Sequence, residues 1–315
     1  MGNGDHLNLI ANIIIERYSI FTLKIISIQN PSNIKLLLAM KTVLFLTNFS
    51  KASTNAISGF LRLYSQYIDE EYKFILLNAY GQPHAASGIL MNMEEMLESF
   101  SNADLEEEQK QYLKILEGKN AQFELMSYDG DIIEAIDFAC KKNIIDLVLM
   151  GSKGSNILRE LLISNNTSRI INLSTIPVMI IPENAVLTIP VKLVFASDMM
   201  TNVKKEEFKK MLERLSVIKA EVLILNVYKH EKPDTEDFEN YMEDNLKTIK
   251  HSFHYVQDSD IAHGISSFVK NVDSDFLALV GREGSFLSKL FHHSMSYKFA
   301  FKADQPVIIL NEAKE

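Results

Sequence analysis

The amino-acid sequence predicts an α/β protein made of two doubly wound domains in tandem, each built on a parallel sheet of five strands. Three observations predict this fold class. Apolar runs of strand length alternate with amphipathic helical segments, one such run (146–150) ends in a pair of glycines, and the whole order of elements occurs twice. Alternating strands and helices are typical of parallel sheets that helices cover on both faces.

The composition fits two domains and argues against several classes of partner. The chain has 315 residues, of which 47% are hydrophobic, which is enough for two apolar cores. Its formal net charge of −9 argues against nucleic acid as a partner, because no basic excess is available to neutralise phosphates. The single cysteine, Cys140, excludes an internal disulfide and fits a reducing compartment, so we expect a cytoplasmic protein. Cys140 shares a helix face with isoleucines, which indicates a buried thiol and not a nucleophile.

Residues 1–39 differ in composition from the rest of the chain. They are rich in Asn, Ile and Ser, and their apolar pieces, such as 9–15, are interrupted by polar residues. The segment is too interrupted to span a membrane, and it lacks the charged, apolar and small-residue order of a signal peptide. We expect an N-terminal extension that is poorly ordered or a mispredicted start, with Met40 as the natural start. An amphipathic arm that binds a partner is the alternative.

The first domain is expected over residues 40–182. Ser50 and Asp131 stand just before helical segments and are expected to cap their N-termini. The glutamates of the long acidic helix, Glu106 to Glu108 among them, are expected to form a solvated face. The expected strands are 41–47, 72–79, 123–126, 146–150 and 176–181, and the expected helices are about 51–67, 92–116, 131–143 and the segment that follows Gly154.

The second domain is expected over residues 191–312 and repeats the same order. An asparagine stands near the end of the second strand in both halves, as Asn78 and Asn226. A connector with a proline at each end, 182–190, separates the halves. Asp260 is expected to cap a helix. The expected strands are 191–198, 221–228, 252–256, 275–280 and 305–310, and the expected helices are about 204–219, 235–250 and 261–271.

Two glycine turns carry a family resemblance. Gly151 and Gly154 are followed after nine residues by Ser164, and Gly281 and Gly284 are followed in the same way by Ser294. Together with the duplicated strand order and the Pro-Val-aliphatic last strands, these turns make the chain resemble the tandem universal stress proteins from Met40 to about Asn311. The resemblance implies two Rossmann-like domains of the adenine-nucleotide-hydrolase type, a fold in which many family members bind ATP.

Both halves depart from the family's binding pattern, in which a third glycine, followed by Ser or Thr, lets the backbone approach the phosphates. Ser164 and Ser294 stand at that glycine, and each adds a side chain there, although a serine hydroxyl can still donate. The acid that contacts the adenosine at the end of the first strand is Asn48 in the first half and Asp198 in the second. The resemblance therefore implies a candidate nucleotide site in the second half at Ala196, Ser197, Asp198, Val227, Val280, Gly281, Arg282, Gly284, His293, Ser294, Met295 and Ser296. It implies a weaker one in the first half at Thr47, Asn48, Ala79, Gly151, Gly154, Ser164, Asn165 and Thr167.

Other chemistry in the sequence is sparse. Cations cluster around the second glycine turn, where they could hold a phosphate or could be ordinary surface residues of an acidic protein: Arg282, Lys289, His292, His293 and Lys298. His251 and His254 would face opposite sides of a strand, so we expect no metal site there. His263 is isolated in the sequence and is expected to be structural or exposed.

Three functions remain open at this stage. The first is a stress-response protein without clear catalysis that binds ATP, or another nucleotide or anion, weakly in its second half. The second is a nucleotide-free scaffold for interaction or dimerisation. The third is a nucleotide-hydrolysing or adenylyl-transfer enzyme, for which the sequence offers no matched set of base, metal carboxylate and lysine.

The resemblance also implies how the halves assemble. The last strands, 178–181 and 307–310, are expected to pair the two halves into a pseudo-dimer within one chain, since an apolar edge strand would otherwise be exposed. A homodimer and an unknown protein partner remain open, and we expect neither nucleic acid nor a membrane as a partner.

We expect the protein purified from its native host to begin at Met40. Intact-mass spectrometry checks this start, and a mass that includes Met1 would contradict it.

Overall fold

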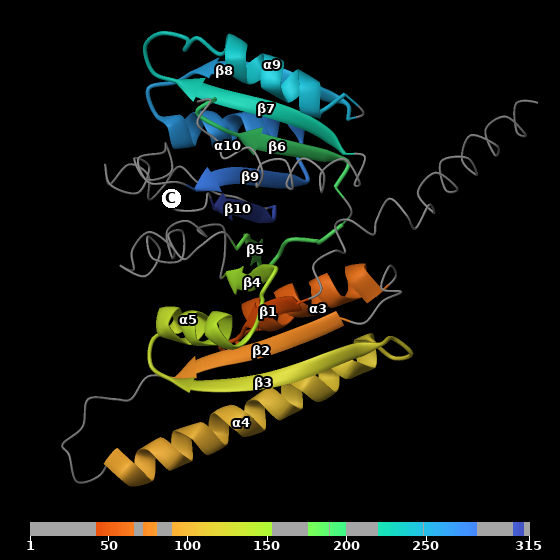
Figure 1. Cartoon of the computed structure of the whole chain (residues 1–315), viewed down its shortest axis with the longest axis vertical. Helices are drawn as coiled ribbons and strands as arrows, with labels where there is room; N and C mark the ends of the chain where they lie inside the picture. Colours follow the sequence, from red (N-terminus) through yellow and green to blue (C-terminus); the bar gives the residue numbers. More distant parts are fainter. Residues whose placement is uncertain are drawn as a thin grey trace, which may run out of the picture.

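The protein folds into two α/β halves whose strands join in one ten-stranded sheet (Figure 1). The first half contains β1 (Thr42–Leu46), α3 (Lys51–Ser65), β2 (Tyr72–Tyr80), α4 (Leu90–Ile115), β3 (Ala121–Asp129), α5 (Ile132–Lys142), β4 (Leu147–Ser152) and β5 (Val178–Pro182). The second contains β6 (Lys192–Ala196), β7 (Glu221–Tyr228), α9 (Glu236–Asn245), β8 (His251–Gln257), α10 (Ile261–Val272), β9 (Phe276–Gly281) and β10 (Val307–Asn311). The computed structural model describes residues 42–65, 72–80, 90–152, 176–188, 190–199, 220–247, 249–281 and 305–311.

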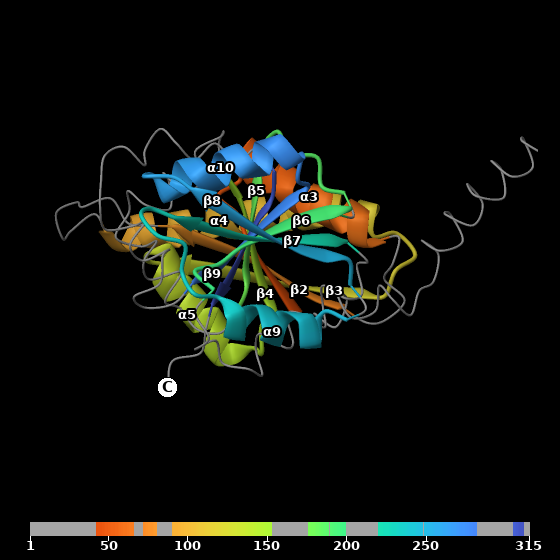
Figure 2. The same ribbon diagram turned by 90° about the horizontal axis from the view of Figure 1, so that it is seen from above.

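The order of strands confirms the predicted fold class. It runs β3-β2-β1-β4-β5-β10-β9-β6-β7-β8, so each half has its first strand in the middle and its last strand at the junction. All pairs within a half are parallel. Viewed from above, the strands fan out as successive pairs twist (Figure 2). Each half is thus a doubly wound parallel sheet of five strands.

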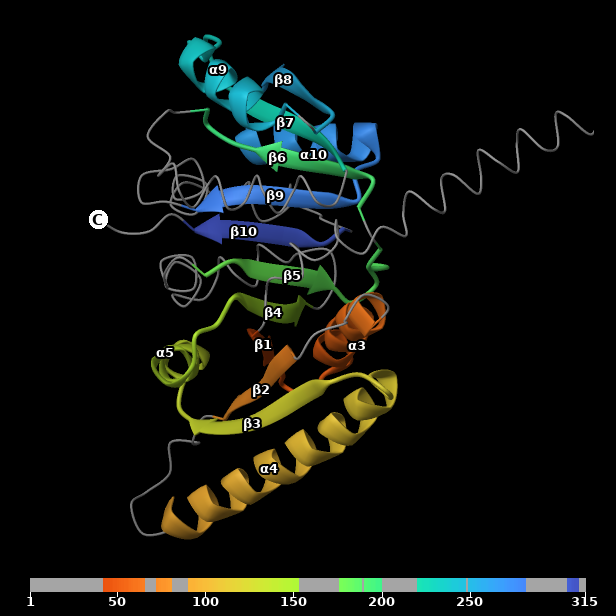
Figure 3. The same cartoon turned by 45° about the vertical axis from the view of Figure 1, so that its right-hand side comes forward.

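The junction between the halves is the antiparallel pair β5–β10. Val178 lies opposite Ile309, and Ile180 lies opposite Val307. Figure 3 shows these two arrows side by side and pointing in opposite directions. All four side chains are buried. The predicted pseudo-dimer, in which the last strands pair, is confirmed, and of the described strands only β3 and β8 lie at sheet edges.

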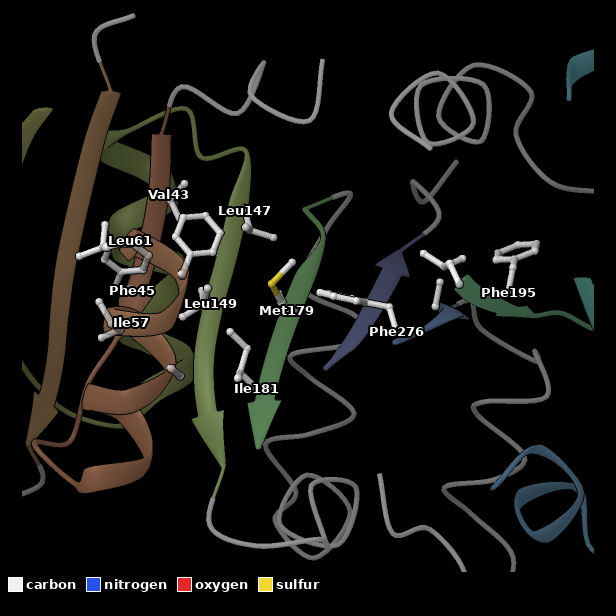
Figure 4. Close-up of a cluster of buried hydrophobic side chains, with 14 of the residues drawn as sticks. Val43, Phe45, Ile57, Leu61, Leu147, Leu149, Met179, Ile181, Phe195 and Phe276 are labelled. Atoms are coloured by element: carbon white, nitrogen blue, oxygen red, sulfur yellow. The ribbon is translucent and has the colours of Figure 1, made fainter. Parts of the chain in front are cut away.

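Two apolar clusters, one on each face of the sheet, run through both halves. Helices α3, α4 and α9 contribute to one cluster, and α5 and α10 contribute to the other. Phe45 lies in the first, stacked on Phe74 at 5.2 Å and edge-on to Phe60 at 5.6 Å between ring centroids. In Figure 4 this cluster continues across the junction from Met179 toward Phe276. The halves therefore share their core.

The predicted helix caps are confirmed. Asp131 accepts hydrogen bonds from the N–H groups of Ile133 and Glu134, and Asp260 accepts them from those of the second and third residues of α10. Ser50 Oγ accepts from the N–H of Ser53 at 3.4 Å. Each cap satisfies backbone donors that the first turn of a helix leaves free.

The expectation that Glu108 belongs to a solvated face is wrong. Its side chain is buried between α3 and α4, where Thr54 Oγ1 donates to its Oε1 at 2.8 Å. Glu106 and Glu107 are exposed as expected. Burial and the neighbouring Glu108 carboxylate raise the pKa of Tyr112, one turn further along α4. A single buried position within a run of glutamates is set by the packing of α3 on α4, which the charge pattern does not report.

The helix expected over 235–250 is shorter than predicted. Helix α9 ends at Asn245, and the chain then turns so that Leu246 and Ile249 enter the core. The carbonyl of Lys250 accepts a hydrogen bond from the N–H of Val222 at 2.9 Å, which starts the pairing of β7 with β8. Burial of two apolar side chains outweighs continuation of the helix.

None of the helices in the described part of the chain combines the length and hydropathy that a bilayer crossing requires.

Gly151 is predicted to be required for packing at the end of β4. A Cβ there would lie 2.1 Å from the carbonyl oxygen of Ala52 and 2.7 Å from the nitrogen of Ser53, in the first turn of α3. Both are backbone atoms, so Gly151→Ala should lower the free energy of unfolding by about 1–3 kcal/mol in a urea titration.

The matched control is Gly59→Ala, within α3 itself. Its Cβ would meet only the Cβ of Leu187 at 3.8 Å, an ordinary contact. Because glycine is a poor helix former, this variant should gain about 0.5–1 kcal/mol. Equal changes in the free energy of unfolding for the two substitutions would contradict the packing role of Gly151.

Candidate functional site

The first strands of both halves end in turns of the same construction. In the first half the N–H of Thr47 donates to the carbonyl of Leu77 at 2.9 Å, and in the second the N–H of Ser197 donates to the carbonyl of Leu225 at 3.0 Å. Both hydroxyl side chains are buried. The duplicated sequence therefore reproduces a specific geometry as well as an order of elements.

The third residue of each turn has a left-handed backbone. Phe49 has a φ of 58° and Met199 has a φ of 55°, although neither is glycine. The N–H of Phe49 donates to Thr47 Oγ1 at 3.0 Å, and the N–H of Met199 donates to Ser197 Oγ at 3.0 Å. This conformation costs about 1–2 kcal/mol for an L-residue, and these hydrogen bonds help to hold it.

A buried asparagine from the neighbouring strand supports each turn. Asn78 Nδ2 donates to the carbonyl of Thr47 at 2.9 Å, and Asn226 Nδ2 donates to the carbonyl of Ser197 at 3.1 Å. The asparagines that recur near the ends of the second strands thus have the same structural role in both halves.

The two asparagines differ in the hydrogen bonding of their side-chain oxygen, Oδ1. Asn78 Oδ1 accepts from Ser101 Oγ at 2.8 Å, and Ser101 Oγ accepts in turn from Ser127 Oγ at 2.7 Å. Asn226 Oδ1 is buried and has no hydrogen-bond partner in the described part of the chain. An unpaired buried acceptor is costly, so this asymmetry needs a cause.

The cause is the length of the covering helix. Tyr112 of α4 and Met242 of α9 are both fully buried, and each accepts a backbone hydrogen bond from a buried leucine four residues later. Ser101 stands eleven residues before Tyr112, within α4. The corresponding residue in the second half is Glu231, which precedes the start of α9 at Glu236. Helix α9 begins too late to provide a partner for Asn226.

Asn48 and Asp198 occupy equivalent positions directly after the turn residues Thr47 and Ser197. Asn48 Oδ1 accepts from the N–H of Ser50 at 3.2 Å and from Ser53 Oγ at 3.2 Å, so it helps to cap α3. Asp198 is partly exposed and places a carboxyl group at the end of β6.

The strand register brings the described candidate residues of each half to one edge of the sheet. Ala196 lies opposite Leu279, so Ser197 and Asp198 follow β6 where Val280 and Gly281 end β9. Val227 lies next to Asn226 near the end of β7. In the first half the same edge carries Thr47, Asn48, Ala79 and Gly151.

The remaining predicted residues lie outside the described residues. In the second half these are Arg282, Gly284, His293, Ser294, Met295 and Ser296, together with Lys289, His292 and Lys298. In the first half they are Gly154, Ser164, Asn165 and Thr167.

Comparison with known proteins assigns the first half to a family. The sequence model of the universal stress protein family matches residues 40–182. The first half of the chain therefore belongs to the universal stress protein family. A search of curated proteins gives no match to the chain.

Solved structures extend the likeness in fold across both halves of the chain. A universal stress protein from Archaeoglobus fulgidus shares 16% identity, with 87% of this chain and 97% of that chain covered and a TM-score of 0.65. This likeness shows the fold of the tandem. A functionally unknown protein from Pseudomonas aeruginosa (10% identity, 88% and 94% covered, TM-score 0.48) and an Arabidopsis thaliana universal stress protein family protein with AMP bound (18% identity, 46% and 93% covered, TM-score 0.33) are more distant.

The histidines of strand β8 do not converge. His251 Nε2 lies 3.3 Å from Glu243 of α9, while the ring of His254 packs 4.9 Å from that of Phe268 of α10. The prediction that they face opposite sides is confirmed. Burial lowers the pKa of His254. Within the described ranges, no group of three His, Cys, Asp or Glu residues could hold a metal ion.

Cys140 is partly buried against the apolar cluster of α5. Burial, with a smaller effect of Asp137, raises the pKa of its thiol. A raised pKa keeps the thiol protonated at neutral pH. The thiol was expected to be buried, and in the structure it is only partly buried.

The network of Ser101 was missed from the sequence, although its spacing of four from the buried Leu105 was available as a signal. Ser101→Ala should leave Asn78 Oδ1 unpaired, as Asn226 Oδ1 already is, and lower stability in a urea titration by about 1–3 kcal/mol.

Ser99→Ala is the control, because Ser99 is exposed on the same helix and gains the same helix propensity. It should remain within about 0.5 kcal/mol of the wild type. If both substitutions had the same effect, the Ser101 hydroxyl would have no part in stabilising the turn.

Proposed function

We propose that this universal stress protein acts in a stress response without catalysis of its own, and that its second half weakly binds ATP or a related adenine nucleotide. The observation that carries the proposal is the buried Asn226 Oδ1, which lies beside the Ser197–Asp198 turn and has no partner among the residues that the structure describes. The equivalent oxygen of the first half, Asn78 Oδ1, already accepts a hydrogen bond from Ser101 Oγ.

The place in the fold supports a ligand site. Ligands of doubly wound sheets bind outside the carboxyl ends of the strands, where the chain switches direction across the sheet. In the second half this switch lies between β6 and β9, since β7 and β8 extend the sheet on one side and β9 and β10 on the other. Asp198 follows β6, and Gly281 ends β9 at this point.

The chemistry of the side chains at the strand ends suggests where the nucleoside and the phosphates of the nucleotide would lie. The Asp198 carboxylate and Asn226 Oδ1 are acceptors, which suit the hydroxyl and amino groups of a nucleoside. A carboxylate repels phosphate. The phosphates would therefore lie toward the end of β9, where Gly281 adds no side chain.

The first half is the poorer candidate. Its acid position holds Asn48, whose side-chain oxygen already caps α3. The space in front of Gly151 is filled by the backbone of Ala52 and Ser53, so this glycine serves the packing of α3 on β4.

Location and partners form a further part of the proposal. Cys140, the single cysteine, is consistent with a cytoplasmic protein. We place contacts with a second copy or another protein at the sheet edges β3 and β8, which the β5–β10 pairing leaves open in the described part of the chain. Light scattering tests the homodimer.

Titration calorimetry with ATP tests the nucleotide site. The full chain should show saturable binding, and Asp198→Ala should weaken it about tenfold or more, because hydrogen bonds to a charged group contribute about 1.5–3 kcal/mol. Asn48→Ala, the matched change in the first half, should leave the affinity unchanged. Unfolding curves of both variants check that they are folded.

Absence of saturation at millimolar ATP would exclude the nucleotide site and favour the nucleotide-free scaffold. Weakening by Asn48→Ala with no effect of Asp198→Ala would place the site in the first half.

A further inference from the structure

Helix α10 and the loop before it carry three hydrogen-bonded side chains, Asp258, His263 and Ser267, which are independent of the nucleotide site proposed above. His263 Nδ1 lies 2.7 Å from Asp258 Oδ2, and Ser267 Oγ lies 3.3 Å from His263 Nε2. Residues four apart on a helix share a face, which explains the second contact. The histidine that looked isolated in the sequence is thus the middle of an ordered Asp–His–Ser arrangement.

Backbone hydrogen bonds hold Asp258 in place. Asp258 Oδ1 accepts from the N–H of Asp260 at 2.8 Å, and the N–H of Asp258 donates to the carbonyl of Tyr228 at 3.0 Å. Gly264 lets α10 pack closely against Val227 of β7 and against Asp258. A Cβ at this position would lie 2.6 Å from the Val227 side chain and 3.1 Å from the Cβ of Asp258. The Asp–His contact therefore forms between positioned groups.

The electrostatics fix the roles of the two imidazole nitrogens. The hydrogen bond from His263 lowers the pKa of Asp258, and the same bond raises the pKa of His263. In the neutral ring the proton lies on Nδ1, next to the carboxylate. The lone pair of Nε2 then faces the Ser267 hydroxyl, which can donate to it.

We propose that Ser267 is an acyl-acceptor site, with His263 as its general base and Asp258 as a positioning residue. Ser267 Oγ attacks the carbonyl carbon of an activated ester, and its proton passes to His263 Nε2. The new bond is Oγ–C, the ester C–O bond breaks, and the alcohol leaves as its anion, with the proton released from His263 to solvent. The three side chains carry out the first half of a serine-hydrolase reaction.

The surroundings limit this reaction to one acyl transfer per chain. Ser267 lies in the interior of α10, where backbone N–H groups bond to carbonyls one turn back and cannot converge on an oxyanion. Without that stabilisation, hydrolysis of the acyl-serine is slow. The expected product is a covalently modified Ser267 at a partly exposed position of α10.

Acetylation by p-nitrophenyl acetate tests the proposal on the full chain at about pH 8.5, above the usual histidine pKa of about 6.5. Peptide mass spectrometry should find the acetyl group on Ser267 at least about tenfold above Ser266, its neighbour on the same helix outside the hydrogen-bonded chain, since general-base catalysis contributes about 10²–10⁴-fold.

Two variants separate this reaction from a purely structural role. His263→Gln keeps a polar side chain on an exposed position but removes the base, so acetylation of Ser267 should fall at least about tenfold. Asp258→Asn should lower it as well, because the neutral ring then loses the partner that fixes its tautomer. A structural role would change the unfolding curve and leave the acetylation pattern unchanged.

Three results would overturn the proposal: equal acetylation of Ser266 and Ser267, unchanged acetylation of Ser267 in His263→Gln, or acetyl groups on His263 alone. None of them bears on ATP binding, so failure here and failure of the nucleotide site are distinguishable.

Discussion

The antiparallel pairing of β5 with β10 is the interaction on which the rest of the structure depends. It joins two parallel sheets through the strands that each would otherwise expose, and it buries their apolar side chains in a common core. An exposed apolar edge strand is prone to pair with other chains, so this contact also protects the protein from aggregation. Because each half pairs through its last strand and this pairing is antiparallel, the strands of the two halves run in opposite directions. The carboxyl ends of the strands in one half therefore point away from those in the other.

Within this shared frame the halves have diverged in how they use polar groups. The strand-end turn, its left-handed third residue and its supporting asparagine are the same in both. The halves differ in the length of the helix that covers this region. Helix α4 has additional turns at its N-terminal end that α9 lacks. Within the described residues, this difference in length gives the Asn78 amide oxygen a partner and leaves Asn226 Oδ1 without one. The asymmetry that suggests a ligand site therefore arises from helix length, and no rearrangement of the sheet is needed.

Much of the fold could be predicted because its signals are local. The buried strands are continuous apolar runs, and the capping residues Asp131 and Asp260 stand at fixed offsets from the helices they begin. The errors arose where distant contacts override local pattern: Glu108 is buried because α3 packs on it, and α9 ends early because Leu246 and Ile249 enter the core. The Asp258–His263 contact was not foreseen, since it depends on how the loop before α10 meets the helix. For the candidate site, the register places the described strand-end residues at one edge of the sheet in each half, while their binding role and the serines after the glycine turns remain predictions.

The connection of both halves in one chain has a consequence for how such a protein can change. In a dimer of identical subunits every substitution occurs twice, so an interface residue must suit its own copy across the symmetry axis. Here Met179 of β5 faces Ile308 of β10, and each half can be altered once and independently. The covalent link also fixes the concentration at which one half meets the other, whatever the amount of protein in solution. One half can then lose a ligand site and continue to serve as the permanent partner of the other.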